Sequence, residues 1–232
     1  MNRRTLLAAL ASTATLATAA TALSRGRGVV VAQLADGSSA PAPAPAPAPP
    51  AGATIAAVEP WEAKLIAAAE SQIGVTVSYD PAYVRIAYPG GDVPRDRGVC
   101  TDVVVRAYRD GLGIDLQQLV HADMAANFAA YPTKWRLARP DSHIDHRRVP
   151  NLQTFLRRRG AALPVGQRGE DYAPGDLVTM MVSGTLPHIA IVSSRRSADG
   201  ARPLIIHNIG AGTRQEDRLF EFPLTGHYRL KP

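Results

Sequence analysis

The order of the sequence patterns predicts an α+β fold, in which N-terminal helices pack on a C-terminal antiparallel sheet. Before residue 160, apolar residues recur at helical spacing, and after residue 174, short β-branched runs are divided by Gly, Pro and Asp. Helices followed by strands are typical of this fold class. The folded part is predicted to be one domain over residues 57–232, which is long enough to bury its own core.

The first 32 residues have the layout of an export signal. Arg3 and Arg4 precede a charge-free run from Thr5 to Leu23 that is rich in Ala, Thr and Leu. The paired arginines indicate the twin-arginine route. The run is also long enough to cross a bilayer, so a retained N-terminal membrane anchor is the alternative to a cleaved signal. We therefore expect a periplasmic or cell-envelope protein.

Residues 33–56 form the predicted linker, because alternating Ala and Pro favour an extended spacer over a helix or a paired strand. Helices are predicted over residues 60–73, 100–110, 116–130 and 151–159, with a long ordered loop over 78–98. The second of these is ambiguous, since three consecutive valines favour a strand, but the flanking glycines and the placement of charges favour a helix.

Five short runs predict the strands of the sheet. They are LVTMMV (177–182), HIAIVSS (188–194), LIIHNIG (204–210), RLFEF (218–222) and HYRL (227–230).

The formal net charge is +6, and arginines gather at 147–148, 157–159 and 195–196. No nucleic-acid-binding motif accompanies them, so no nucleic-acid partner is expected. A solvated face is predicted, with contact to an anionic wall polymer as the alternative.

Cys100 is the only cysteine of the chain, so an internal disulfide is excluded. It is a buried apolar residue, an intermolecular partner or a working thiol. At the start of a helix, unpaired N–H groups and the helix dipole would lower the pKa of a thiol. A nucleophilic thiol also needs an imidazole as its base and a group that orients this imidazole.

Two histidines in consecutive predicted strands provide these groups. His188 begins one strand and His207 lies in the next, so they would meet at one end of the sheet facing Cys100. Asn208 is the alternative to His207 as the orienting residue. Asp102 is interpreted as a helix cap and not as a catalytic acid.

The series PGDLV, PHIAIVSS and LIIHNIG resembles the strands of NlpC-type cell-wall peptidases of the papain-like superfamily. This resemblance implies an NlpC/papain-like fold with Cys100 as nucleophile, His188 as base and His207 as orienting residue. It also implies a tyrosine near the thiol, without a choice among the tyrosines at 79, 83 and 88. The sequence departs from the usual Asp-Cys-Ser-Gly, since Val99 and Thr101 flank the cysteine. Longer phrases such as HNIGAGTRQEDRLF resemble domain-of-unknown-function family 1287 over roughly Trp61 to Leu230.

The stretch DSHIDHRR is a rival site, because His143, Asp145 and His146 are metal-ligand types at close spacing and His121 would complete them. The flanking prolines and adjacent arginines favour a hydrogen-bonded structural loop. We expect neither a metal nor a cofactor.

Together these patterns predict an exported cysteine hydrolase that cleaves amide bonds, in peptidoglycan stem peptides, with a Cys-His-His triad. Its partner would be peptidoglycan or another cell-envelope polymer, and the protein would be a monomer. A catalytically idle envelope-binding module and a thiol acyltransferase on the same fold are the alternatives.

Overall fold

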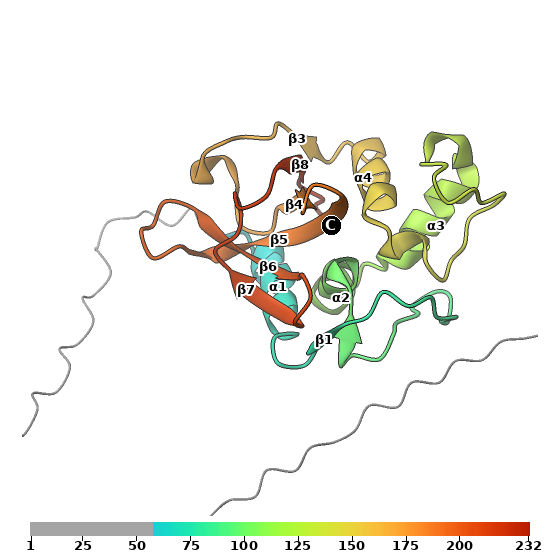
Figure 1. The fold of residues 1–232 in the computed structure, drawn as a ribbon, viewed down its shortest axis with the longest axis horizontal. Coiled ribbons are helices and arrows are strands. Elements are labelled where there is room, and N and C mark those ends of the chain that lie inside the picture. The colour runs from blue at the N-terminus through green and yellow to red at the C-terminus, as the bar shows by residue number, and fades with distance from the viewer. Residues whose placement is uncertain (1–57) are drawn as a thin grey trace, which may run out of the picture. The chain divides into compact units, whose positions relative to one another are not determined.

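The computed structural model of the chain describes residues 58–232 (Figure 1). The predicted export signal (1–32) and linker (33–56) lie outside the described residues. Among the described residues, no helix is both long and apolar enough to cross a bilayer.

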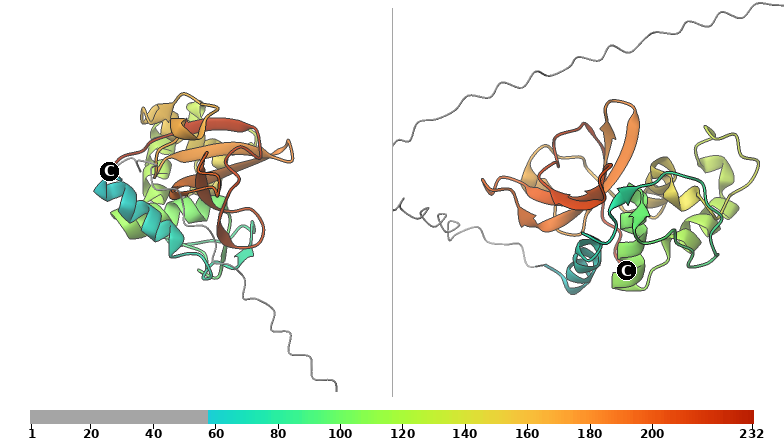
Figure 2. Two further views of the ribbon diagram at one scale, coloured as in Figure 1. Left: turned by 90° about the vertical axis from the view of Figure 1, so that its left-hand side faces the viewer. Right: turned by 60° about the horizontal axis from the view of Figure 1, so that its bottom comes forward.

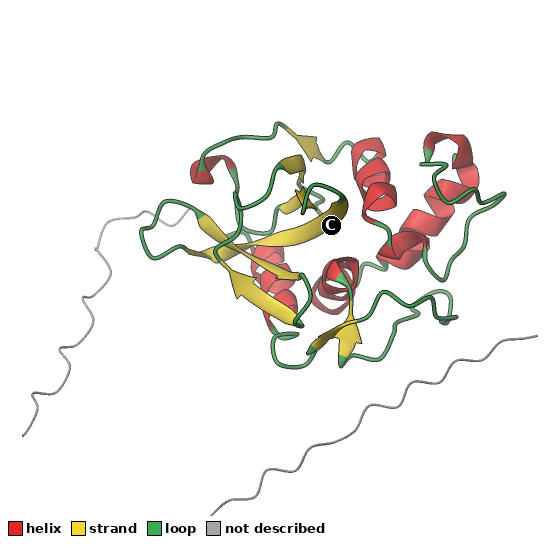
Figure 3. Cartoon of the chain, viewed as in Figure 1, coloured by secondary structure: helices red, strands yellow, loops and turns green. Residues whose placement is uncertain are grey.

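Four α-helices lie where helical spacing predicted them: α1 (Pro60–Glu70), α2 (Cys100–Leu112), α3 (Leu116–Ala126) and α4 (Val149–Arg158). The predicted third helix is shorter than expected, because residues 128–130 form a separate 3₁₀ turn, η1 (Phe128–Ala130). Two further 3₁₀ turns are η2 (Asp145–Arg147) and η3 (Gly169–Asp171). Figure 3 shows α3 and α4 to the right of the six-stranded sheet, and α1 behind its strands.

Six strands form one antiparallel sheet in the order β3-β8-β4-β5-β6-β7. They are β3 (Ala162–Leu163), β4 (Leu177–Val182), β5 (Leu186–Arg196), β6 (Pro203–Asn208), β7 (Thr213–Glu216) and β8 (Leu224–Tyr228). In the loop before α2, β1 (Ser78–Tyr79) and β2 (Arg97–Gly98) form a short parallel pair. The α+β prediction is confirmed, with the helices before the sheet in the chain (Figures 1 and 2).

The predicted strand RLFEF is wrong, because residues 219–221 form a turn. Leu219 is fully buried in this turn, so its apolar character reflects packing and not a strand. The strand next to β6 is instead the polar TRQE of β7, whose residues pair from Thr213 with Asn208 to Glu216 with Ile205. Backbone pairing thus makes a strand where side-chain polarity gave no signal.

Helix α2 overrides the strand propensity of its three valines. Asp102 accepts a hydrogen bond from the backbone N–H of Val99 at 2.7 Å, which caps the start of the helix. Gly113 ends it with a φ of 69°, a conformation that glycine adopts without strain. All three valines are buried between the helices and the sheet, and this packing stabilises them in the helix.

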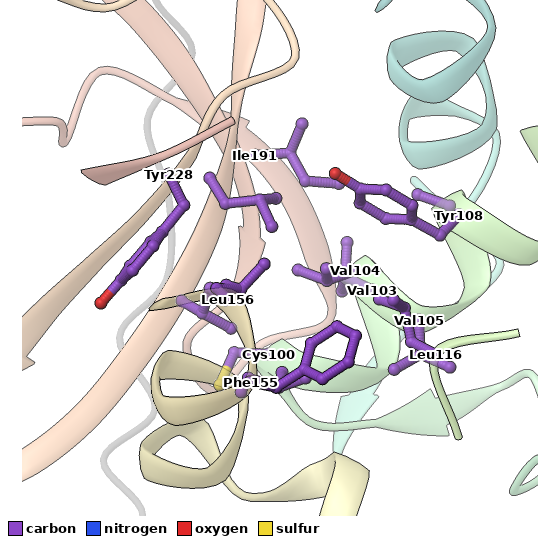
Figure 4. Packing of buried hydrophobic residues seen from close by; sticks show 14 of the residues in the cluster. Cys100, Val103, Val104, Val105, Tyr108, Leu116, Phe155, Leu156, Ile191 and Tyr228 are labelled. Atoms are coloured by element: carbon purple, nitrogen blue, oxygen red, sulfur yellow. The ribbon is translucent and has the colours of Figure 1, made fainter. Parts of the chain in front are cut away.

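The main hydrophobic cluster lies between the four helices and the sheet, and Figure 4 shows Cys100 within it. A second cluster contains alternate residues of β4, β5 and β6, including Val178, Ala190 and Ile205. Because side chains alternate along a strand, the sheet is covered on both faces. The start of α2 is therefore held firmly against the middle of the sheet.

Candidate active site

Cys100 is the first residue of α2, and only 3% of its surface is exposed. That small exposed part lines a cavity of about 400 Å³. Tyr79, Trp135 and Pro187 are among the other residues that line it. A small molecule or peptide side chain in this cavity would reach the sulfur.

The pKa of the Cys100 thiol is raised to about 12, and the expected low pKa is therefore wrong for this structure. Burial is the largest cause, and the nearby Asp102 carboxylate adds to it. The backbone N–H groups of Ile189, Thr101 and Cys100 itself favour the thiolate, as a helix start should, but burial outweighs them. The resting thiol is protonated at neutral pH.

His188 and His207 contact each other directly. His188 Nε2 lies 2.8 Å from His207 Nδ1, and both rings are buried. The strands that carry them, β5 and β6, are antiparallel neighbours. Backbone pairing between β5 and β6 ends at Ile191 and Ile206 on this side, and the two histidine side chains continue the contact beyond it.

A carboxylate continues the histidine pair. His207 Nε2 lies 3.1 Å from Glu216 Oε2 on β7, and Arg218 Nε lies 3.3 Å from the same oxygen. Sequence reasoning missed Glu216, because TRQE showed no strand pattern. Its register opposite β6 would have been the only signal.

This chain of contacts determines the tautomers. An ionised Glu216 only accepts, so His207 donates from Nε2 and, when neutral, has an unprotonated Nδ1. His188 must then donate from Nε2 to His207, which leaves the lone pair of His188 on Nδ1. His188 is thus prepared to accept a proton at Nδ1.

Both imidazoles are neutral at pH 7. Burial lowers the pKa of His188 to about 3, and the neighbouring His207 contributes to the shift. Burial also lowers the pKa of His207, although Glu216 opposes this. In the resting site, the Cys100 thiol and the His188 imidazole are therefore both neutral. A low thiol pKa would instead have given a thiolate–imidazolium pair.

Cys100 shares its cavity with Pro187, the residue before His188 on β5, and the backbone N–H of Ile189, the residue after His188, favours the thiolate. Within residues 58–232, no hydrogen bond joins the thiol to the His188 ring. The structure thus brings the two histidines together and places Cys100 beside the backbone that carries His188.

Asn208, the alternative orienting residue, is occupied elsewhere. Its side-chain N–H₂ donates to the carbonyl oxygens of Ser78 at 3.1 Å and Gly98 at 3.0 Å, and its oxygen accepts from Gly210. It ties β6 to the β1–β2 pair and leaves the contact with His188 to His207.

The predicted solvated face at residues 147–148 is wrong for Arg147. Its guanidinium is buried and forms a two-pronged ion pair with Asp102, each N···O distance being 2.9 Å. It also donates to the carbonyl oxygens of Asp80 and Ala82. Arg147 thereby neutralises a carboxylate next to the thiol and fixes the loop after β1.

Tyr79 and Tyr83 line the cavity with Cys100, whereas Tyr88 packs on His121 with 4.8 Å between ring centroids. Burial raises the pKa of Tyr79 to about 12, and Cys100 is the next cause. Tyr79 therefore keeps its proton at neutral pH and lies close to the thiol.

The stretch 141–148 is a packed loop. Asp145 pairs with Arg148 at 3.0 Å and also accepts from the Asp141 N–H, while burial lowers the pKa of His146 to about 3. Among residues 58–232, no three His, Cys, Asp or Glu side chains gather as a metal site requires. This loop contributes Arg147 and Arg148 to the wall of the cavity beside Cys100.

Comparison with known proteins identifies the family. The family described as "Domain of unknown function (DUF1287)" matches residues 66–230. The chain belongs to this family. It is also 56% identical over 161 residues to a protein of Escherichia coli (strain K12) named "Uncharacterized protein YijF", over 69% of this chain and 78% of that protein.

Proposed function

We propose that this DUF1287 protein is a cysteine hydrolase of amide bonds with an NlpC/papain-like arrangement. The observation that carries the proposal is the chain from His188 through His207 to Glu216, which begins one residue after Pro187 on the wall of the Cys100 cavity. Such a chain leaves one imidazole lone pair free, as a general base requires.

In the proposed reaction, the Cys100 sulfur attacks the amide carbon as its proton passes to His188 Nδ1. The carbon–nitrogen bond then breaks, and His188 returns the proton to the departing amine. Water next attacks the thioester, with His188 again as base, and releases the carboxylic acid and the thiol. His207 holds His188 in the required tautomer throughout.

Two groups support the developing oxyanion. The backbone N–H groups at the start of α2 are oriented along the helix axis beside Cys100. The protonated Tyr79 hydroxyl, on the same cavity, is a further donor. Both act on charge that exists only during the reaction, so they need no preformed thiolate.

The proposed substrate is the stem peptide of peptidoglycan, and the proposed location is the periplasm or cell envelope. The support is the resemblance to NlpC-type cell-wall peptidases and the signal-like pattern of residues 1–32. Muropeptides incubated with wild type, Cys100→Ala and His188→Ala would be compared by mass spectrometry. Wild type should hydrolyse an amide bond, so that the masses of the two products sum to that of the muropeptide plus one water, and neither variant should form these products. If wild type forms no new product, the proposal is contradicted.

A catalytically idle binding module is the second candidate. The raised pKa of the Cys100 thiol and the missing direct hydrogen bond to His188 favour it. It predicts that wild type and Cys100→Ala retain muropeptides equally and leave them intact.

A further inference from the structure

The cavity beside Cys100 carries cationic side chains but no carboxylate. Its basic lining residues are Lys134, Arg147 and Arg148, and the others are apolar, aromatic or the cysteine itself. Tyr83 on its wall donates to Asp141 at 3.1 Å, but that carboxylate does not line the cavity.

Four of the five N–H groups of the Arg147 guanidinium are already bonded within the protein. Its three guanidinium nitrogens already bond Asp102 and the carbonyl oxygens of Asp80 and Ala82. Its charge is also balanced by Asp102, whereas Arg148 keeps unbonded nitrogens beside its own partner Asp145 and Lys134 has no carboxylate partner among the described residues.

Arg148 and Lys134 both lie over the indole ring of Trp135. Arg148 Cζ is 4.2 Å and Lys134 Nζ is 4.8 Å from the ring centroid. Arg148 donates to Asp145 through Nη1 alone. Among the described residues, its other nitrogens have no hydrogen-bond partner, and Lys134 has neither a hydrogen bond nor an ion pair.

Two cations on one aromatic ring repel each other, and the ring only partly offsets this. An anion bound in the cavity that both residues line would reduce this repulsion and form charge-assisted hydrogen bonds with their free N–H groups. The side chain of Arg148 is only 16% exposed, so the bonds that it forms to an anion would be partly shielded from water.

We propose that Lys134 and Arg148 bind a carboxylate of the substrate, with Trp135 packing against its aliphatic part, so that the peptide recognised is acidic. Recognition of the carboxylate is argued from the residues that line the cavity, whereas cleavage of the bound peptide rests on the proposed function. Lys134, Trp135 and Arg148 are thus specificity-determining residues.

The test measures binding without catalysis. Full-length Cys100→Ala protein is titrated by calorimetry with N-acetyl-Ala-Glu-amide and with N-acetyl-Ala-Gln-amide, each with L and D second residues. These peptides differ only in charge, and the acid should bind about tenfold more tightly in one stereochemical form, as expected for charged hydrogen bonds. Added salt should reduce the preference.

Three further variants show which residues cause the preference for the acidic peptide. Lys134→Gln and Arg148→Gln should each reduce the preference for the acid, whereas Lys64→Gln on the exposed side of α1 should keep it. Lys134 is exposed and makes no ion pair with another described residue, so the Lys134→Gln variant should fold even if Arg148→Gln does not. Equal affinities for both peptides, no binding of the acid, or a preference that survives Lys134→Gln would overturn the proposal. Because the nucleophile is absent from every arm, these outcomes are independent of whether wild type hydrolyses muropeptides.

Discussion

Lowering the pH from 7 to 5 should destabilise this protein through its buried histidines. His188 and His146 have pKa values of about 3 in the folded chain, against an ordinary value of 6.5. As the pH falls through 6.5, the unfolded chain takes up these protons first, so stability is lost between about pH 6.5 and 3. The linkage relation gives a loss of about 2 kcal/mol per histidine between pH 7 and 5. The lowered pKa of His207 acts in the same direction.

Urea unfolding followed by tryptophan fluorescence at both pH values measures this loss. His188→Asn should lose about 2 kcal/mol less than wild type between pH 7 and 5, whatever its stability at pH 7. Val103→Ala, which removes buried methyl groups from α2 but no titrating group, should keep the wild-type loss. If His188→Asn lost as much stability as wild type, His188 would not be held neutral, and its role as a base at Nδ1 would lose its electrostatic support.

Four other outcomes are expected. Arg147→Met should cost about 3–5 kcal/mol of unfolding free energy because it leaves the buried Asp102 unpaired, and adding Asp102→Asn should recover part of it in the same urea assay. Glu216→Ala should lower kcat for muropeptides about tenfold with little change in KM, and Glu216→Gln, which keeps an acceptor oxygen, should lower it less; equal effects would argue against tautomer control. Gly111→Ala should destabilise the fold despite better helix propensity, since its Cβ would lie 2.6 Å from a backbone oxygen of α1. Iodoacetamide should label Cys100 slowly in folded protein at pH 7 and faster on unfolding, because burial raises the pKa of the thiol; rapid labelling at pH 6 would restore the ion-pair mechanism.

The sequence predicted the helices and the central strands because their apolar residues follow the period of each element. It also placed Cys100 at the start of a helix and the two histidines on neighbouring strands, as the structure has them. Strand β7 was beyond such reasoning, because its residues are polar and its conformation depends on pairing with β6. Glu216 was missed for the same reason.

The electrostatics of the site depend on burial, which local sequence does not contain. A helix start predicts a low thiol pKa, but the enclosure of Cys100 by distant elements reverses the direction. Likewise, adjacent arginines predicted a solvated face, whereas Arg147 forms a buried ion pair with Asp102, which lies 45 residues earlier in the chain. Ion pairs between residues so far apart in the sequence can be identified only once the fold is known.

The most direct test of the central claim is to trap the acyl-enzyme. Wild type, Cys100→Ala and His188→Ala would each be mixed with muropeptides, quenched in acid within the first turnovers, and measured as intact protein by mass spectrometry. Wild type should gain the mass of an acyl fragment that maps to Cys100 and disappears with hydroxylamine, and neither variant should gain it. Muropeptide hydrolysis by Cys100→Ala at the wild-type rate, or a wild-type protein that never carries the adduct while product forms, would contradict the assignment of Cys100 as the nucleophile.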